Sequence, residues 1–237
     1  MEITNKILTE LMSDDGHVGT IVYSPKHDKI ARRQGTIKTL KELNVKNVIH
    51  IGCCGHLRNV KNQIKNKTSF HMMLVDSFEK VIGFDINEDA VNYLSNFTDN
   101  VYAKDVTQDV ESIHQIINNV WEDKPYAILI PEVLEHIINP VAFLENVATN
   151  YGGAQNPIVI SVPNAYGFGR ICKILFHNAE EINMDHKYMF TPTTILKVMQ
   201  VSGITPLELK FFDFYKLPRL FKKYACANTI LVVGTAK

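Results

Sequence analysis

The sequence has no excess of either charge. Its 237 residues include 25 Lys and Arg and 25 Asp and Glu, which cancel at pH 7. Proteins that bind nucleic acids or anionic membranes usually attract them with a basic excess. A net charge of zero allows a local basic patch, but it argues against nucleic acid as the partner.

Cysteine is scarce and long apolar runs are missing. The cysteines are Cys53, Cys54, Cys172 and Cys226, without C-x-x-C spacing. Two are neighbours, which ordinary disulfide geometry disfavours. No apolar run reaches the roughly 18 residues of a membrane helix, and "MEITNKILTE" lacks the basic-then-apolar pattern of a signal peptide. We therefore expect a cytoplasmic protein with reduced thiols and no membrane span.

From about residue 45, short apolar runs alternate with amphipathic ones. The runs typical of buried strands are 45–52, 80–86, 100–105, 126–130 and 157–163, and two closing strands are expected at 207–215 and 228–236. Helical spacing occurs at 87–97, 110–121, 139–151 and 191–203, the last with Thr191 as N-cap and Pro192 at N1. Such repeated units predict an α/β fold: a doubly wound, mostly parallel seven-stranded sheet with helices on both faces.

Two segments fall outside this alternation. Residues 1–44 contain one helical pattern, "KIARRQGTIKTLKEL", after a polar start. We predict an N-terminal helical segment there that can serve as a lid. Residues 169–190 interrupt the alternation after the fifth strand and can cover the binding crevice.

The carboxyl ends of the strands carry an ordered set of small and acidic residues. The crevice of a doubly wound sheet lies beyond these ends. The first strand ends at 52–55, Gly-Cys-Cys-Gly, where a ligand can approach the backbone closely. Asp85 and Asp105, after the second and third strands, can accept hydrogen bonds from ribose hydroxyls and from an adenine amino group. Each also has an ordinary interpretation, as a turn, a helix cap or a loop aspartate; together they predict a nucleoside-containing cofactor.

The same segments resemble motifs of the class I S-adenosylmethionine-dependent methyltransferases. "VIHIGCCG", "VIGFDINEDAV", "NVYAKDV" and "YAILIPEVLEHI" look like the first four motifs of that family. The sequence departs from the family pattern at His50, where an acidic residue is usual, and in the first loop, which reads G-C-C-G-H instead of G-x-G-x-G. The resemblance implies an S-adenosylmethionine-binding domain over residues 45–237. It also implies the cofactor-binding residues Gly52, Cys53, Gly55, Asp85, Ile86, Asp105, Val106 and Pro131.

A group of proton- or metal-handling residues follows the fourth strand. Glu132, Glu135 and His136 have i, i+3 and i+4 spacing, which places side chains on one face if the segment is helical. With His186 of "NMDHKYMF", they resemble the E-x-x-E-H signature and distant histidine of small-RNA 3′-end methyltransferases and ubiquinone-type O-methyltransferases. We predict these four residues as catalytic and as ligands of a divalent metal, Mg²⁺ or Mn²⁺. Two alternatives stay open: a histidine acting as base without metal, and a purely structural role.

The resemblance implies an O-methyltransferase that acts on a small-molecule or saccharide acceptor. RNA 3′-terminal ribose 2′-O-methylation is a second interpretation, and a non-catalytic cofactor-binding protein is a third. A nucleotide-dependent dehydrogenase shares the predicted fold, but the G-x-G-x-x-G spacing is absent. The oligomeric state is left open.

Overall fold

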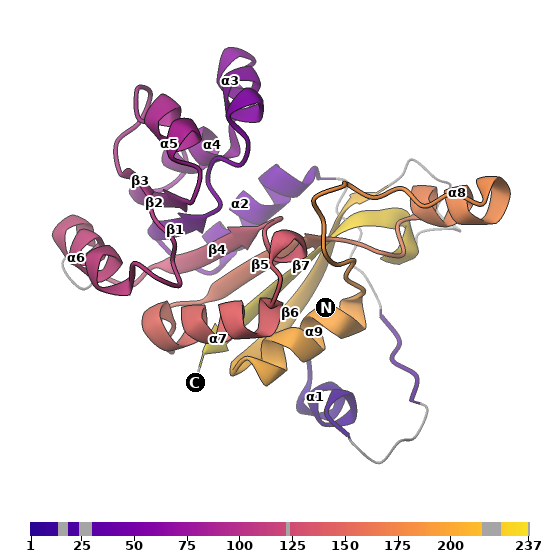
Figure 1. The fold of residues 1–237 in the computed structure, drawn as a ribbon. Helices are drawn as coiled ribbons and strands as arrows, with labels where there is room; N and C mark the ends of the chain where they lie inside the picture. The colour runs from indigo at the N-terminus through magenta and orange to yellow at the C-terminus, as the bar shows by residue number, and fades with distance from the viewer. Residues whose placement is uncertain (14–18, 24–29, 122–123, 215–223, 237) are drawn as a thin grey trace.

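The structure is a seven-stranded sheet covered by helices on both faces (Figure 1). It is a computed structural model that describes residues 1–13, 19–23, 30–121, 124–214 and 224–236. The strand order is β3-β2-β1-β4-β5-β7-β6. The predicted α/β class and its mostly parallel, doubly wound sheet are confirmed.

The first five strands are parallel, and β7 pairs antiparallel with both β5 and β6. Their bounds are β1 Asn47–Ile51, β2 Lys80–Asp85, β3 Val101–Ala103, β4 Ala127–Pro131, β5 Ile158–Pro163, β6 Ile204–Phe214 and β7 Ala227–Ala236. The chain runs outward from β1 to β3 on one side and from β4 onward on the other. The strand order therefore reverses between β1 and β4, where such sheets form a ligand crevice at their carboxyl ends.

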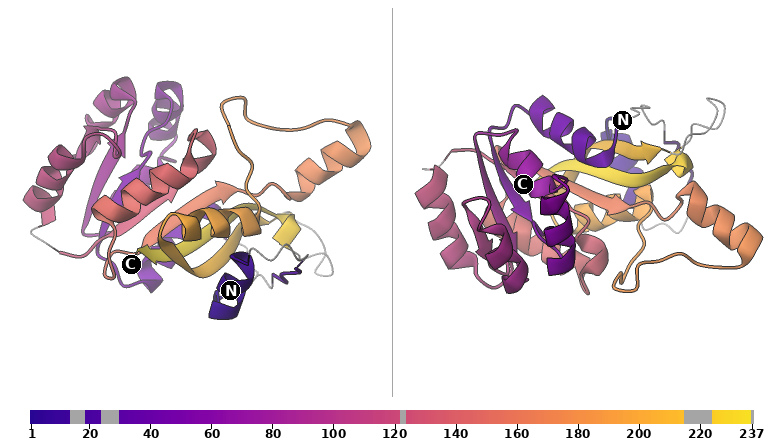
Figure 2. Two further views of the ribbon diagram at one scale, coloured as in Figure 1. Left: turned by 60° about the horizontal axis from the view of Figure 1, so that its bottom comes forward. Right: turned by 90° about the horizontal axis from the view of Figure 1, so that it is seen from above.

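Helices cover the two faces of the sheet unequally (Figure 2). Their bounds are α1 Asn5–Leu11, α2 Arg32–Glu42, α3 Leu57–Lys65, α4 Phe70–Val75, α5 Glu88–Leu94, α6 Val110–Trp121, α7 Pro140–Tyr151, α8 Phe168–His177 and α9 Pro192–Val201. On β1, Ile49 packs into a large core with residues of α1, α6, α7 and α9, whereas Val48 packs with Leu40 and Leu74 of α2 and α4. Adjacent residues of one strand thus face opposite layers, as the two-residue period of a strand requires.

The ends of several helices follow their local sequence. Helix α9 begins with the predicted N-cap Thr191, which forms a reciprocal capping box with Thr194, and Pro192 occupies the first turn. Gly203, just beyond the helix, has φ +78°, a conformation that glycine adopts without strain. Helices α3 and α4 were not predicted. Each is short, at nine and six residues, although Leu57, Val60 and Ile64 of α3 do have helical spacing and pack in one cluster.

The N-terminal segment joins the body of the protein at the β6 edge. The backbone N–H of Ile3 donates to Leu207 O at 2.8 Å, and that of Leu209 donates to Met1 O at 2.8 Å. Leu8 and Leu11 of α1 are buried in the large core. A lid role for residues 1–44 stays a prediction. Among the described helices, none combines the length and apolarity needed to cross a membrane.

Helix α8 is unlike the other helices because none of its residues is buried. It follows β5, and the chain returns to the sheet through a long irregular segment, residues 178–190 (Figure 1). This segment is anchored where the backbone N–H groups of Lys187 and Tyr188 donate to Glu135 O. The excursion therefore brings residues 185 and 186 back to the end of β4.

Candidate active site

The first loop is tied to the end of β2 by one carboxylate. Asp85 Oδ2 accepts hydrogen bonds from the backbone N–H groups of Cys54 and Gly55, at 2.8 and 2.9 Å, and Oδ1 accepts from Asn87 N at 3.0 Å. Gly52 and Gly55 have φ values of +75° and +68°, which favour glycine. Asp85 therefore shapes the loop into which the predicted cofactor would bind.

The other predicted cofactor residues also lie along the carboxyl ends of the strands. Ile86 is 79% exposed beside Asp85, although it is a large apolar side chain. Asp105 Oδ1 accepts hydrogen bonds from both the N–H and the hydroxyl of Thr107. Val106 is buried, and its carbonyl accepts from the Tyr151 hydroxyl at 2.8 Å. Gly52, Cys53 and Pro131 complete the set. All eight residues lie at or just beyond the carboxyl ends of β1, β2, β3 and β4.

His50, the departure from the family pattern, lies inside the protein. Its Nδ1 is 3.1 Å from Nδ1 of His71, and both residues are buried. Burial lowers the pKa of His50 well below its usual value, and it lowers the pKa of His71 to about 4. Both imidazoles are therefore neutral at pH 7 and pack in the core beneath the first loop.

The segment after β4 is not the helical turn that the spacing of its polar residues suggests. Only Leu134–His136 forms a turn, the 3₁₀ helix η1, and Glu132 precedes it with φ +54°. The carboxylate of Glu132 forms an ion pair with Arg32 and accepts a hydrogen bond from Ser161 Oγ at 3.1 Å. The prediction that these residues share one helical face is therefore wrong. Glu132, where the helix would have started, has a left-handed backbone conformation instead.

Three of the four predicted catalytic residues come together. One ligand atom each from Glu135, His136 and His186 lies within 4.8 Å of the others. The rings of His136 and His186 meet edge to face, with centroids 4.6 Å apart. Glu135 is only 1% exposed, yet neither of its carboxylate oxygens has a hydrogen-bond partner among the described residues, and the same is true of His186 Nδ1.

The electrostatics of this cluster follow from burial. Burial, with the nearby carboxylate of Glu132, raises the pKa of Glu135 to about 8, although Arg32 acts in the opposite direction. Burial and the neighbouring His136 lower the pKa of His186. Buried polar groups are normally hydrogen-bonded, and perturbed titrating groups concentrate at functional sites. The carboxylate oxygens of Glu135 and Nδ1 of His186 could therefore bind a cation or an acceptor hydroxyl.

Asp185 links the cluster to the first loop. Its Oδ2 lies 3.2 Å from His136 Nδ1 and 3.5 Å from His56 Nε2, and His56 is the N-cap residue of α3. A carboxylate that holds one ring nitrogen of a histidine orients the other nitrogen. Asp185 therefore positions His136 within the cluster.

Three solved structures with a similar arrangement of strands and helices are methyltransferases. A SAM-dependent methyltransferase from Archaeoglobus fulgidus is 16% identical, with a TM-score of 0.56 over 86% of this chain and 94% of the other. The fold is that of the S-adenosylmethionine-dependent methyltransferases. Magnesium protoporphyrin IX methyltransferase from Synechocystis PCC 6803, solved with bound SAH, is 14% identical, with a TM-score of 0.51 over 86% of this chain and 81% of that one.

A third structure with this methyltransferase fold is that of the small RNA methyltransferase HEN1. It is 15% identical, with a TM-score of 0.60 over 90% of this chain but only 28% of the longer protein. No protein-family model matches the sequence, and no curated protein matches it. The similarity therefore establishes the methyltransferase fold, while the E-x-x-E-H branch rests on the residues themselves.

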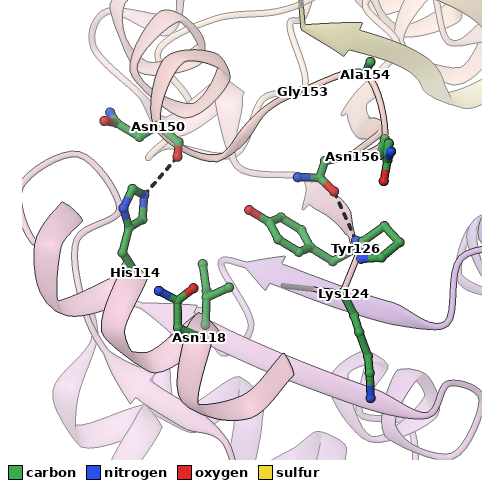
Figure 3. A pocket seen from close by; sticks show the side chains of 11 residues that line it. His114, Asn118, Lys124, Tyr126, Asn150, Gly153, Ala154 and Asn156 are labelled. Atoms are coloured by element: carbon green, nitrogen blue, oxygen red, sulfur yellow. Dashed lines mark hydrogen bonds between the residues drawn. The ribbon is translucent and has the colours of Figure 1, made fainter. Parts of the chain in front are cut away.

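A pocket of about 450 Å³ lies at the opposite ends of the strands, beside the amino ends of β4 and β5 (Figure 3). Its lining comes from α6 and from the segments that precede β4 and β5: His114, Ile117, Asn118, Lys124, Pro125, Tyr126, Asn150, Gly153, Ala154, Gln155 and Asn156. Several polar groups of this pocket are already paired. His114 Nε2 is 2.9 Å from Asn150 O, and Asn156 Oδ1 accepts from Tyr126 N. The pocket holds none of the predicted site residues.

Two residues of the site have no signal in the sequence. Arg32 lies in the first turn of α2, where basic residues usually serve as solvent-exposed charges, and Ser161 lies within the apolar run of β5. Both contact Glu132 only because the fold brings α2 and β5 beside the end of β4. Local sequence patterns carry no information about such contacts.

Proposed function

We propose that this protein is an S-adenosylmethionine-dependent O-methyltransferase whose acceptor is a hydroxyl group of a small molecule or a saccharide. The observation that carries the proposal is the cluster of Glu135, His136 and His186 at the carboxyl ends of the strands of a methyltransferase fold. A hydroxyl is a weak nucleophile until its proton is removed or its oxygen is ligated. The cluster offers groups for either purpose.

The residues at the first three strand ends fit the cofactor. Asp85 keeps the first loop open around two glycines, and Oδ1 bonds only one N–H of the described chain. Gly55 has no atom within 4 Å of the position that a Cβ would occupy, so the loop leaves free space there. We expect Asp85 to hold the ribose, Asp105 the adenine amino group, and Ile86 the apolar face of the base. S-adenosylmethionine would supply an electrophilic methyl group on a sulfonium.

The donor atoms of the cluster also fit a divalent metal. One buried carboxylate and two imidazoles are a ligand set typical of transition metals, whereas Mg²⁺ prefers oxygen ligands alone. We therefore favour Mn²⁺ over Mg²⁺. Such a cation would lower the pKa of the acceptor hydroxyl. Glu132, predicted as a fourth ligand, is paired instead with Arg32 and Ser161 and would have to leave both to join.

The protein residues have distinct roles in this scheme. Without a metal, His186, whose pKa is lowered, is neutral at pH 7 and can accept the proton of the acceptor hydroxyl; with a metal bound, it would be a ligand instead. Asp185 orients His136 through its Nδ1. Arg32 neutralises Glu132, and so limits the negative charge beside Glu135. The segment 178–190 brings His186 to the cluster and is held there by the hydrogen bonds of Lys187 and Tyr188 to Glu135 O.

Ligand binding and chelation test the proposal in two steps. S-adenosylhomocysteine should raise the melting temperature, because a ligand at about 100 times its Kd stabilises a protein by about 2.7 kcal/mol, whereas NAD should have no effect. A shift with NAD alone would contradict the cofactor assignment. With a methylatable acceptor, EDTA should abolish turnover and Mn²⁺ should restore it. If chelation has no effect and the rate rises as a histidine deprotonates, the base acts without metal.

A second candidate function is methylation of RNA. It is favoured by the similarity to a small RNA methyltransferase and by the resemblance of the E-x-x-E-H segment. The balanced charge argues against it, since affinity for a phosphate backbone depends on Lys and Arg. Binding to a short RNA that weakens steeply with added salt, together with methylation of that RNA, would establish this function in place of the first.

A further inference from the structure

A second group of metal-ligating side chains lies in the first loop, apart from the Glu135 cluster. Ligand atoms of Cys53, Cys54 and Asp85 lie within 4.8 Å of one another. The two thiols are free and their Sγ atoms are 3.6 Å apart. All three residues are at most 9% exposed. Adjacent cysteines usually point to different sides of the chain, so two sulfurs that converge on one carboxylate are an unusual arrangement.

The side chains of Cys53 and His71 pack closely over Gly83 of β2. A Cβ at Gly83 would stand 2.8 Å from Cys53 Sγ and 2.7 Å from Cε1 of His71. Only a glycine at this position lets both side chains lie over β2. His71 is completely buried, and its Nε2 has no hydrogen-bond partner among the described residues. A neutral imidazole whose Nε2 has no partner among the described residues therefore lies beside the same glycine as Cys53 Sγ.

The chemistry of these donors selects one class of ligand. Thiolates and imidazole are soft or borderline ligands and favour Zn²⁺ and similar cations, whereas Mg²⁺ and Ca²⁺ favour oxygen. Binding converts two thiols to thiolates, so each bound cation forms two metal–sulfur bonds and releases two protons to solvent. A disulfide between neighbouring cysteines is disfavoured by its geometry, so oxidation is a poorer explanation for the converging sulfurs.

We propose that Cys53, Cys54 and Asp85 form a binding site for a thiophilic divalent cation such as Zn²⁺, and that its occupation opposes binding of the cofactor. The first half is independent of the proposed function, and the second half rests on it. Asp85 is shared: its Oδ2 braces the loop amides of Cys54 and Gly55, and the proposed cofactor needs the same carboxylate for its ribose. A cation ligated by Asp85 competes for that group. By linkage, cofactor must weaken cation binding to the same extent.

The test uses Cd²⁺ as a spectroscopic probe for thiolate ligation. The full chain with His186→Ala, which removes the other cluster, is titrated with Cd²⁺ while the sulfur-to-metal charge-transfer absorption is recorded. One Cd²⁺ per chain should bind with this absorption. Adding Cys54→Ser should abolish the absorption and weaken binding by more than about 100-fold, beyond the effect of losing an outer hydrogen-bond partner of a ligand. Cys172→Ser, on α8, is the matched control and should change neither quantity.

Three outcomes would overturn the site: no thiolate absorption, absorption that survives in Cys54→Ser, or absorption that is lost in Cys172→Ser. If Cys54→Ser does not fold, phenylarsine oxide, which bridges two neighbouring thiols, replaces the mutation. It should add once per chain and block the Cd²⁺ absorption; failure to block it contradicts the proposal.

Competition with the cofactor is measured separately. The thermal shift produced by S-adenosylhomocysteine should shrink as Cd²⁺ saturates the site, and chelation should restore it. An undiminished shift refutes the competition while the cation site stands. A missing shift in metal-free protein refutes the proposed function, and the absorption titration still tests the cation site.

Discussion

The two edges of the sheet differ in the state of their polar groups. At the amino ends of β4 and β5, a pocket of about 450 Å³ is lined by polar side chains, among them His114, Lys124 and Asn156, and by several apolar residues. His114 and Asn156 are both paired with backbone groups of the pocket. At the carboxyl ends, Glu135 is buried and His186 is half-buried, and both carboxylate oxygens of Glu135 and Nδ1 of His186 have no hydrogen-bond partner among the described residues.

We propose the site at the carboxyl ends because polar atoms there are buried without partners, and not because of the volume of a pocket. A buried carboxylate without partners is costly, and the neighbouring charges raise its pKa further. Proteins retain such groups where a ligand completes them. A polar hollow whose groups are paired needs no ligand for its stability.

The largest expected difference between the edges is catalytic. His186→Ala should lower turnover by about 10²- to 10⁴-fold, because it removes the proton acceptor of the metal-free version or a ligand of the metal version, while binding of S-adenosylhomocysteine is retained. The matched change at the amino edge, His114→Ala, should leave turnover unchanged. Steady-state kinetics with any accepted hydroxyl compound provide the measurement. Equal losses in both variants would remove the distinction between the edges.

The next effect is on the pH dependence of stability. The folded-state pKa of Glu135 is about 8, against an ordinary value of 4.5, so the folded protein binds an extra proton between these values. The stability of metal-free protein should therefore be full below about pH 4.5 and fall as pH rises toward 8. The loss should be on the order of 3 kcal/mol, since solvent relaxation reduces the full effect of the shift.

Urea unfolding at a series of pH values in the presence of a chelator measures this loss. Glu135→Gln, which cannot ionise, should remove this contribution to the slope. Glu145→Gln, an exposed glutamate on α7, should keep it. A wild-type slope in the Glu135 variant would show that this carboxyl is not the titrating group.

A third effect concerns the first loop. Asp85→Ala should eliminate the stabilisation by S-adenosylhomocysteine, worth about 2.7 kcal/mol at 100 times Kd, because the loop loses its brace and the ribose its acceptor. Each thermal shift is referred to the ligand-free form of the same variant. Asp89→Ala, on the exposed side of α5, is the control and should retain the shift. If Asp85→Ala retains the thermal shift, Asp85 is not part of the cofactor site.

The smallest effect is structural and belongs to the amino edge. Asn156→Ala removes the side-chain oxygen that accepts a hydrogen bond from Tyr126 N at 3.2 Å. This should lower the free energy of unfolding by about 1 kcal/mol, the usual net value of one hydrogen bond, without changing turnover. A large loss of activity in this variant would give the amino-edge pocket a functional role.

The sequence was sufficient to predict the seven strands and the helices α2, α5, α6, α7 and α9, and with them the carboxyl ends of the strands as the place of the candidate site. Apolar runs and amphipathic periods are local properties, and a doubly wound sheet places every parallel strand end at one edge. The prediction that Glu135, His136 and His186 meet followed from the same logic together with a family resemblance. The prediction of a helical turn beginning at Glu132 was wrong. The same spacing of polar residues is compatible with a left-handed backbone conformation at Glu132 followed by a 3₁₀ turn.

The sequence by itself determined the fold class and the identity of the titrating groups at the strand ends. Only the tertiary structure decided their state: which carboxylate pairs with Arg32, which is buried without a partner, and which sulfurs converge on Asp85. The physical reason is that periodicity and propensity depend on neighbours along the chain. Burial, ion pairing and pKa depend on residues far apart in sequence that folding brings together, such as Arg32 and Glu132 or Glu135 and His186.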